Sequence, residues 1–144
     1  MSGTILDLTA LRDAIAALAD GLEVVGDAAW FPAQSEKVRN TLIAGVIQSF
    51  EFVYEIGVKM IKRRIEMDAL SPDAVDRANF RELLREAGET GLIEDVEAWF
   101  GYRRMRNLTA HTYDHAKAAQ VYRDTVAFLA DARALLARLE ARNV

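Results

Sequence analysis

Residues 35–67 read SEKVRNTLIAGVIQSFEFVYEIGVKMIKRRIEM, and this stretch decides the fold class. Its apolar side chains recur at intervals of three, four or seven residues along two stripes, one of Val38, Leu42, Val46, Val53 and Met60 and the other of Ile43, Ile47, Phe50, Tyr54, Ile61 and Ile65. This spacing is typical of an α-helix. A helix that is apolar on two sides packs against partners on both flanks. We therefore expect residues 35–67 to form the central helix of a bundle.

Four further helices are predicted around this one. Residues 8–26 carry a single apolar stripe that ends near Gly26. Downstream, helical patterns cover 71–88, 96–108 and 115–142, and no convincing run of alternating β-branched residues suggests a strand. The prediction is an all-α fold, an up-and-down bundle of four to five helices in one domain spanning residues 1–144.

Local signals set the helix ends. Ser71, Pro72 and Asp73 form a start signal of capping hydroxyl, first-turn proline and early acid, and Gly88 is a suitable C-terminal glycine. Asp95 can cap the helix over 96–108. The connector between the first two helices contains Trp30 and Phe31, an aromatic pair that we expect to plug into the bundle.

Composition narrows the function classes. The chain has 144 residues, of which 51% are hydrophobic and 28% charged, as in globular domains. Because it has no cysteine, disulfides, thiolate catalysis and cysteine-based metal sites are excluded. No uninterrupted apolar stretch approaches the ~18 residues needed to cross a bilayer, and the N-terminus lacks a secretory pattern. We expect a cytoplasmic protein without a membrane partner. Its net charge of −4 means that contacts with phosphates require a local basic surface.

Conventional catalytic motifs are missing from the sequence. It contains no Gly-rich phosphate loop, nucleophile elbow or His-Glu-x-x-His motif. His111 and His115 could hold a metal if they shared a helix face, but Asp114 and the polar residues before it suggest a break there. We therefore expect neither a metal site nor a cofactor.

The most informative stretch is residues 106–113, RNLTAHTY, in which arginine, asparagine, histidine and tyrosine follow the pattern Arg-Asn-x3-His-x-Tyr. This block resembles the signature of the HEPN superfamily and, more narrowly, of the nucleotidyltransferase substrate-binding proteins. Residues 48–55 (QSFEFVYE) and 91–95 (GLIED), the latter followed by Trp99, resemble other parts of that family. The likeness spans roughly residues 8–139. Ala110 departs from the pattern, since many members have serine there.

The resemblance implies a HEPN-like dimer in which two copies of the motif face each other across a cleft. It also implies a ribonuclease that cleaves RNA without metal, by attack of the ribose 2′-hydroxyl on the adjacent phosphate. His111 would act as general base or acid, Arg106 would stabilise charge on the phosphate, and Asn107 would donate to a phosphoryl oxygen. On a continuous helix Arg106 and His111 would point about 140° apart. They converge only if the helix ends near 109–111 or if two subunits share the site.

Dimerisation would also give three aromatic residues an interface to fill: Trp99, Phe100 and Tyr102. Members with this motif are paired with a small nucleotidyltransferase, the antitoxin of a two-gene toxin–antitoxin module, which is thought to attach AMP to the tyrosine that corresponds to Tyr113. Added bulk and negative charge two residues from His111 would block phosphate entry. Tyr113 could equally cover the end of the bundle.

Two alternatives stay open from the sequence. The chain could be a non-catalytic subunit that binds a nucleotide or another substrate for its nucleotidyltransferase partner, or a scaffold whose motif is inert. Basic residues that could bind RNA occur on two predicted helices: Lys59, Lys62, Arg63 and Arg64 on the second, and Arg103 and Arg104 beside the motif. A solvated face near a helix C-terminus explains the first group equally well.

Overall fold

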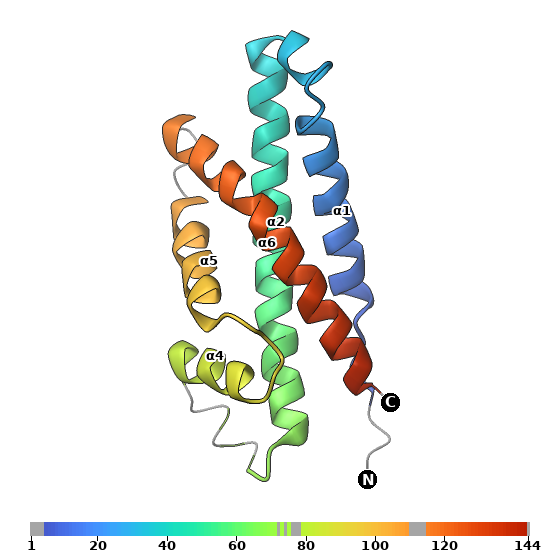
Figure 1. Cartoon of the computed structure of the whole chain (residues 1–144), viewed down its shortest axis with the longest axis vertical. Helices are drawn as coiled ribbons and strands as arrows, with labels where there is room; N and C mark the ends of the chain where they lie inside the picture. The colour runs from blue at the N-terminus through green and yellow to red at the C-terminus, as the bar shows by residue number, and fades with distance from the viewer. Residues whose placement is uncertain (1–4, 72, 74, 76–78, 110–114, 144) are drawn as a thin grey trace.

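The computed structural model describes residues 5–71, 73, 75, 79–109 and 115–143. These residues contain no strand, which confirms the all-α prediction. One short 3-10 helix, η1 (Phe31–Ala33), and five α-helices have defined bounds: α1 (Thr9–Val25), α2 (Glu36–Asp68), α4 (Phe80–Glu89), α5 (Val96–Leu108) and α6 (His115–Arg142). Asp73 and Val75 are helical as well. In Figure 1, α1 and α2 run side by side as a long hairpin, α6 crosses them diagonally, and α4 and α5 lie on the other flank of α2.

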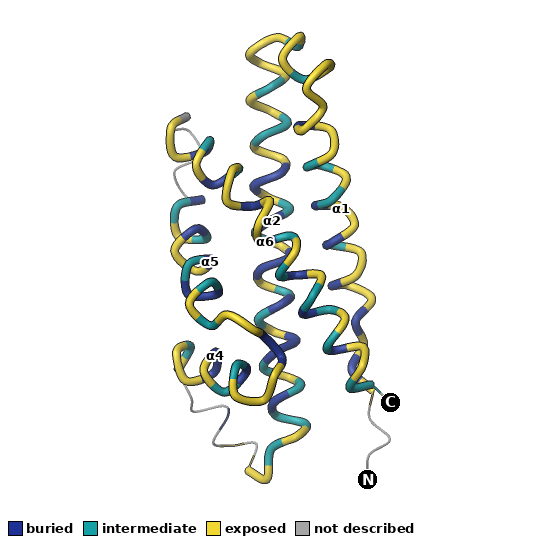
Figure 2. The backbone as a smooth tube through the Cα atoms, viewed as in Figure 1, coloured by how far each residue is buried: buried dark blue, intermediate teal, exposed yellow. Residues whose placement is uncertain are grey.

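The central position expected for the second helix is confirmed, because α2 contacts α1, α4, α5 and α6. The hydroxyl of Ser35 caps it by accepting from the N–H of Val38 at 3.2 Å. Buried residues recur along α1, α2 and α6 (Figure 2). The start of the first predicted stripe is an exception, since Val38 remains 39% exposed.

By length and composition, α2 could cross a membrane: one 18-residue window has a mean hydropathy of 1.3, and 33% of it is buried. The core helix of a soluble bundle has the same length and composition. No membrane-spanning segment was predicted from the sequence, because the criterion there was an unbroken run of apolar residues. The mean hydropathy of α2 is high although polar residues interrupt its apolar ones.

The single helix predicted over residues 71–88 is wrong, because the helix is interrupted at Asn79. Asn79 has extended backbone angles (φ −78°, ψ 172°), so α4 begins only at Phe80. The Asn79 side chain accepts from the N–H of Glu82 at 2.9 Å and donates to the Glu82 carboxylate at 3.2 Å, a reciprocal cap. Of the predicted start signal, Pro72 lies outside the described residues.

The end of α4 also differs from the prediction. The helix passes Gly88 and ends at Glu89, and the left-handed residue is Gly91, with φ +82°. The N–H of Leu92 donates to the Ala87 carbonyl at 2.9 Å, and that of Gly91 to the Gly88 carbonyl at 3.2 Å, which is a Schellman motif. Gly91 is needed here because other residues rarely adopt this backbone conformation.

Aromatic side chains form the centre of the core. The rings of Phe50 and Phe128 lie 4.8 Å apart, and Tyr102 lies 4.8 Å from Phe128, both edge to face. Trp99, Phe100 and Tyr102 are 2%, 6% and 6% exposed within a single chain, so the expectation that they fill a dimer interface is wrong. They cannot serve an interface because they are already buried against their own bundle.

The connector before α2 is likewise only partly packed. Phe31 is partly buried against the core, but Trp30 is 44% exposed, so the aromatic pair does not plug into the bundle as expected. Trp30 instead lies in a turn that Asp27 holds by accepting from two backbone N–H groups, those of Ala29 and Trp30.

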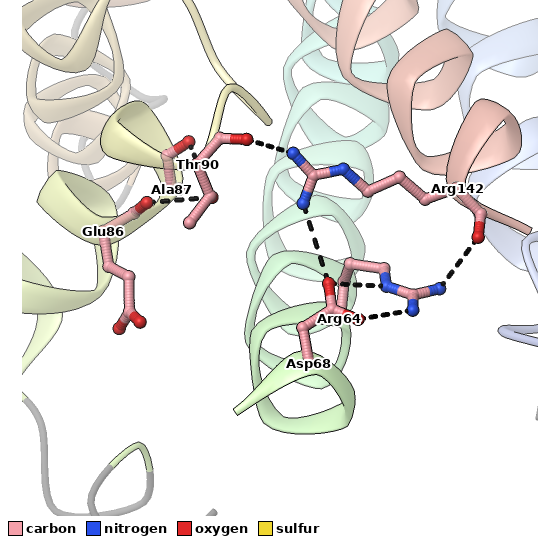
Figure 3. A network of polar contacts seen from close by, with 6 residues as sticks. All are labelled: Arg64, Asp68, Glu86, Ala87, Thr90 and Arg142. Atoms are coloured by element: carbon pink, nitrogen blue, oxygen red, sulfur yellow. Dashed lines mark hydrogen bonds and ion pairs between the residues drawn. The ribbon is translucent and has the colours of Figure 1, made fainter. Parts of the chain in front are cut away.

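A network of polar contacts joins three distant parts of the chain (Figure 3). Arg142 at the end of α6 donates to the Thr90 carbonyl and forms an ion pair with Asp68 at 3.7 Å. Arg64 donates to the same Asp68 carboxylate at 2.7 Å. Arg64 is therefore engaged in holding the fold and does not join an RNA-facing surface. The network fixes the turn from which α5 begins.

Candidate functional site

The first half of the motif lies at the end of α5. Asp95 caps this helix by accepting from the Ala98 N–H at 3.1 Å, as predicted, and the helix ends at Leu108. Thr109 follows as a buried C-cap whose hydroxyl donates to the Arg106 carbonyl at 2.6 Å. The end of α5 meets one of the two conditions under which Arg106 and His111 could converge. His111 and Tyr113 lie outside the described residues.

Arg106 is held by two glutamates of α2. Its Nε and Nη2 atoms donate to one Glu55 carboxylate oxygen at 3.0 and 2.8 Å, and Nη2 lies 3.5 Å from a Glu51 oxygen. Its Nη1 donates to the Thr109 hydroxyl at 3.0 Å. The hydrogen bond with Glu55 raises the pKa of Arg106 above its usual value. The guanidinium is thus fixed on every nitrogen while its side chain remains 35% exposed.

The two glutamates were not among the predicted site residues. They occur in the stretch 48–55 that resembles the family, spaced four residues apart so that both point to one side of α2. That spacing was the available signal, but the sequence does not show that this side faces Arg106.

Two adjoining hollows beside the motif share part of their lining. An open hollow of about 630 Å³ is lined by Tyr54, Glu55, Val58, Phe80, Arg103, Arg106 and Asn107. The next, of about 470 Å³, is lined by Asn79, Phe80, Arg81, Phe100, Arg103, Arg104 and Asn107. The two share Phe80, Arg103 and Asn107, so we treat them as one feature, the α4–α5 groove.

Arginine side chains cover aromatic rings along this groove. Arg103 of α5 lies 4.2 Å from the ring centre of Phe80, and Arg81 of α4 lies 4.7 Å from that of Phe100. The structure therefore brings Arg103, with Arg104, to the same groove as Arg106. Arg81 was not identified as a site residue from the sequence. The helix was predicted to begin at 71–73, whereas α4 begins at Phe80, next to Arg81.

The predicted basic residues of α2 are divided between two locations. Lys59 and Lys62 follow Glu55 at four and seven residues, so they extend along the side of α2 that meets Arg106. Arg63 instead lines a separate hollow with Leu6 and Asp7 near the N-terminus. It is not brought together with the α5 arginines.

Tyr54 forms part of the groove wall next to Arg106. Burial raises the pKa of its phenol to about 12, although the nearby charges of Arg103 and Arg106 oppose the rise. Tyr54 is therefore a neutral hydroxyl at physiological pH. Among the residues that the structure describes, no three His, Cys, Asp or Glu side chains could together hold a metal ion.

Comparisons with known proteins agree with this geometry. The model of the family described as "nucleotidyltransferase substrate binding protein like" matches residues 6–141. A Haemophilus influenzae protein named "probable ribonuclease HepT" is 44% identical over 138 residues, which cover 96% of this chain and 94% of the relative. A solved Haemophilus influenzae structure, described as showing the fold of a substrate-binding domain of a nucleotidyltransferase, has a TM-score of 0.91 and 43% identity, over 93% of this chain and 99% of that one. The chain therefore belongs to the HEPN-type family of nucleotidyltransferase substrate-binding proteins.

Proposed function

We propose that this protein is a metal-independent endoribonuclease, the toxin of a two-gene toxin–antitoxin module in the cytoplasm. The observation that carries the proposal is Arg106, which is partly exposed at an open groove and held in one orientation by Glu51, Glu55 and Thr109. A fixed guanidinium beside Asn107 can bind the charge that develops on a phosphate during cleavage. The name of the Haemophilus influenzae relative supports this reaction class.

The reaction proceeds by internal attack within the RNA. The ribose 2′-hydroxyl loses its proton to a base, its oxygen bonds to the adjacent phosphorus, and the bond from phosphorus to the 5′-oxygen breaks. The leaving oxygen takes up a proton, and the products are a 2′,3′-cyclic phosphate and a 5′-hydroxyl. His111 is the proposed proton acceptor or donor, since imidazole titrates near neutrality. Arg106 and Asn107 stabilise the phosphorane oxygens.

The active form in this proposal is a homodimer. One side of α2 leaves Val38 and Phe52 39% and 52% exposed, and Gly45 lies midway between them at seven-residue spacing. A Cβ at Gly45 would meet nothing within 4 Å, so a second helix could approach closely there. This side of α2 continues toward Glu55, so a dimer formed through it would bring two copies of the motif near each other. A monomer by light scattering at micromolar concentration would contradict the dimer.

The proposed antitoxin is a small nucleotidyltransferase that transfers AMP to Tyr113. In that step the phenolic oxygen attacks the α-phosphorus of ATP, pyrophosphate leaves, and the phenol proton passes to solvent or base. The family description supports a partner of this class. The added phosphate would repel RNA from the motif.

Expression in a bacterial host tests the toxin. Wild-type protein expressed alone should arrest growth and cleave cellular RNA, and co-expression of the neighbouring nucleotidyltransferase should restore growth. Incubation with that enzyme and ATP-Mg should add one AMP to the Tyr113 peptide by mass analysis, but not in Tyr113→Phe. Equal toxicity of His111→Ala and wild type would defeat the ribonuclease proposal.

One observation favours a second candidate function, a substrate- or nucleotide-binding subunit of a nucleotidyltransferase. Arg106 is paired with two carboxylates, those of Glu51 and Glu55, an arrangement that is also suited to a purely structural or docking role. If purified protein leaves RNA intact but binds the nucleotidyltransferase in an Arg106-dependent manner, this second function is the correct one.

A further inference from the structure

Three exposed arginines line the smaller hollow of the groove, and one of them, Arg104, also lines a hollow beside α6 that includes Asp124. Arg81, Arg103 and Arg104 are exposed, and none forms an ion pair with any residue in the described part of the chain. Together they line the 470 Å³ hollow, whose described lining residues include no Asp or Glu. Like charges gathered around one hollow repel each other. Such an arrangement is most simply explained by an anionic ligand.

The geometry of the two helices produces this cluster. On α5, residues 100, 103, 104 and 107 follow the spacing of one helix face, so two arginines and Asn107 line a single side. The start of α4 faces that side and contributes Asn79, Phe80 and Arg81. The backbone N–H groups of its first turn add partial positive charge to that of the side chains.

The cluster is continuous with the proposed cleavage site. Arg103 and Asn107 line both hollows, and Arg106 lines the adjoining one. Phosphates along an extended strand are spaced a few ångströms apart, so a strand with one phosphate at Arg106 would have its neighbours along the groove. The rings of Phe80 and Phe100 are covered by guanidinium groups, which leaves those charged groups at the surface.

We propose that Arg81, Arg103 and Arg104 form a subsite that binds the phosphodiester backbone of an RNA strand next to the cleaved linkage. The inference rests on the proposed ribonuclease function and adds the start of α4, with Arg81, to the substrate-binding surface. Phosphate esters are the shared chemistry of an RNA backbone and a free nucleotide. An RNA strand is the better candidate because the two hollows share lining residues, so that successive phosphates of one strand can lie in both.

Binding of a labelled RNA tests this subsite independently of cleavage. The probe is a fluorescein-labelled 12-nucleotide single-stranded RNA, followed by fluorescence anisotropy against full-length His111→Ala protein, which keeps the probe intact. Adding Arg81→Gln and Arg104→Gln should weaken binding roughly 10-fold near 50 mM salt and reduce the slope of log K against log salt by about 1.4, two contacts at ~0.7 each. Glutamine retains part of the aliphatic stem, and circular dichroism checks the fold.

Matched variants separate charge from packing. Arg133→Gln, an exposed arginine on α6 outside the groove, should leave binding and slope unchanged. Arg81→Lys with Arg104→Lys should restore most of the slope, because it restores the charge. If the glutamine pair binds RNA as wild type does, the subsite is refuted. If ATP binds in an Arg81-dependent manner and RNA does not, the assignment to RNA is refuted. It is also refuted if an acidic partner protein is the only ligand whose binding depends on Arg81. RNA binding lost in the glutamine pair supports the subsite even if wild-type protein fails to cleave.

Discussion

The two sides of α5 carry arginines in opposite electrostatic settings. Arg106 points toward α2, where the two carboxylates of Glu51 and Glu55 outweigh its single charge and Thr109 completes its hydrogen bonds. Arg103 and Arg104 lie on the side that meets α4, where no described acidic side chain pairs with them. On a regular helix, Arg106 lies about 110° from the middle of that second side.

This difference suggests two separate roles: Arg106 is positioned to stabilise the reacting phosphate, and Arg103 and Arg104 attract the RNA strand. A guanidinium fixed by carboxylates has lost conformational freedom before substrate arrives, which is useful for stabilising a transition state. Arginines without partners supply net positive potential, which attracts an anionic strand to a protein whose total charge is −4. If the comparison holds, variants on the two sides should affect different steps.

The largest effect is expected for Arg106→Ala. Cleavage of RNA should fall about 100- to 1,000-fold because the transition-state charge loses its donor. Affinity for RNA should fall by a much smaller factor than the rate, because the variant leaves Glu51 and Glu55 without their cation but leaves the three arginines of the proposed subsite in place. The measurement is single-turnover cleavage together with anisotropy, and Arg133→Ala, an exposed arginine of α6, is the control. A loss of RNA affinity without a loss of the cleavage rate would contradict the role of Arg106 in the cleavage step.

An intermediate effect is expected at Glu55. Glu55→Ala removes the acceptor for two Arg106 nitrogens, so the guanidinium becomes mobile and the cleavage rate constant should fall roughly 10- to 100-fold. Glu55→Gln keeps an acceptor oxygen but removes the charge, so it should cleave faster than Glu55→Ala and bind RNA more tightly than wild type. Glu97→Ala, on the exposed surface of α5, serves as the control. If the alanine and glutamine variants behave alike, Glu55 does not position Arg106.

The smallest effect concerns Tyr54 and high pH. Because burial raises its pKa in the folded protein to about 12, above the ~10 of an exposed phenol, folding favours the protonated form. This contribution to stability is complete below pH 10 and is lost as the pH rises from about 10 to about 12. Denaturant unfolding across this range should show a shallower loss in Tyr54→Phe than in wild type. Equal pH dependence in the two proteins would show that the groove wall next to Arg106 is not buried as described.

The sequence predicted the parts of the fold that depend on local chemistry. The stripes of α1 and α2, the cap at Asp95, and the end of α5 near the motif all follow from neighbouring residues. The break before α4 was missed because the start signal at 71–73 obscured the reciprocal cap that begins at Asn79.

Long-range pairings could not be derived from one sequence. The sequence around an aromatic residue such as Trp99 does not show whether its own bundle or a second subunit buries the side chain. The contact between Arg106 and Glu55 joins residues 51 positions apart, and only the packing of α5 on α2 brings them together. The motif therefore located the arginine but not the groups that orient it, nor Arg81 across the groove.

The chemistry of the product ends tests the central claim most directly, namely that this motif cleaves RNA through the substrate's own 2′-hydroxyl without a metal. A defined RNA should be incubated with purified protein in excess EDTA, and the ends of the fragments analysed by mass spectrometry. The account predicts 2′,3′-cyclic phosphate and 5′-hydroxyl ends, with no fragments from His111→Ala. Fragments with 5′-phosphate and 3′-hydroxyl ends, or cleavage that stops when EDTA is added, would contradict it.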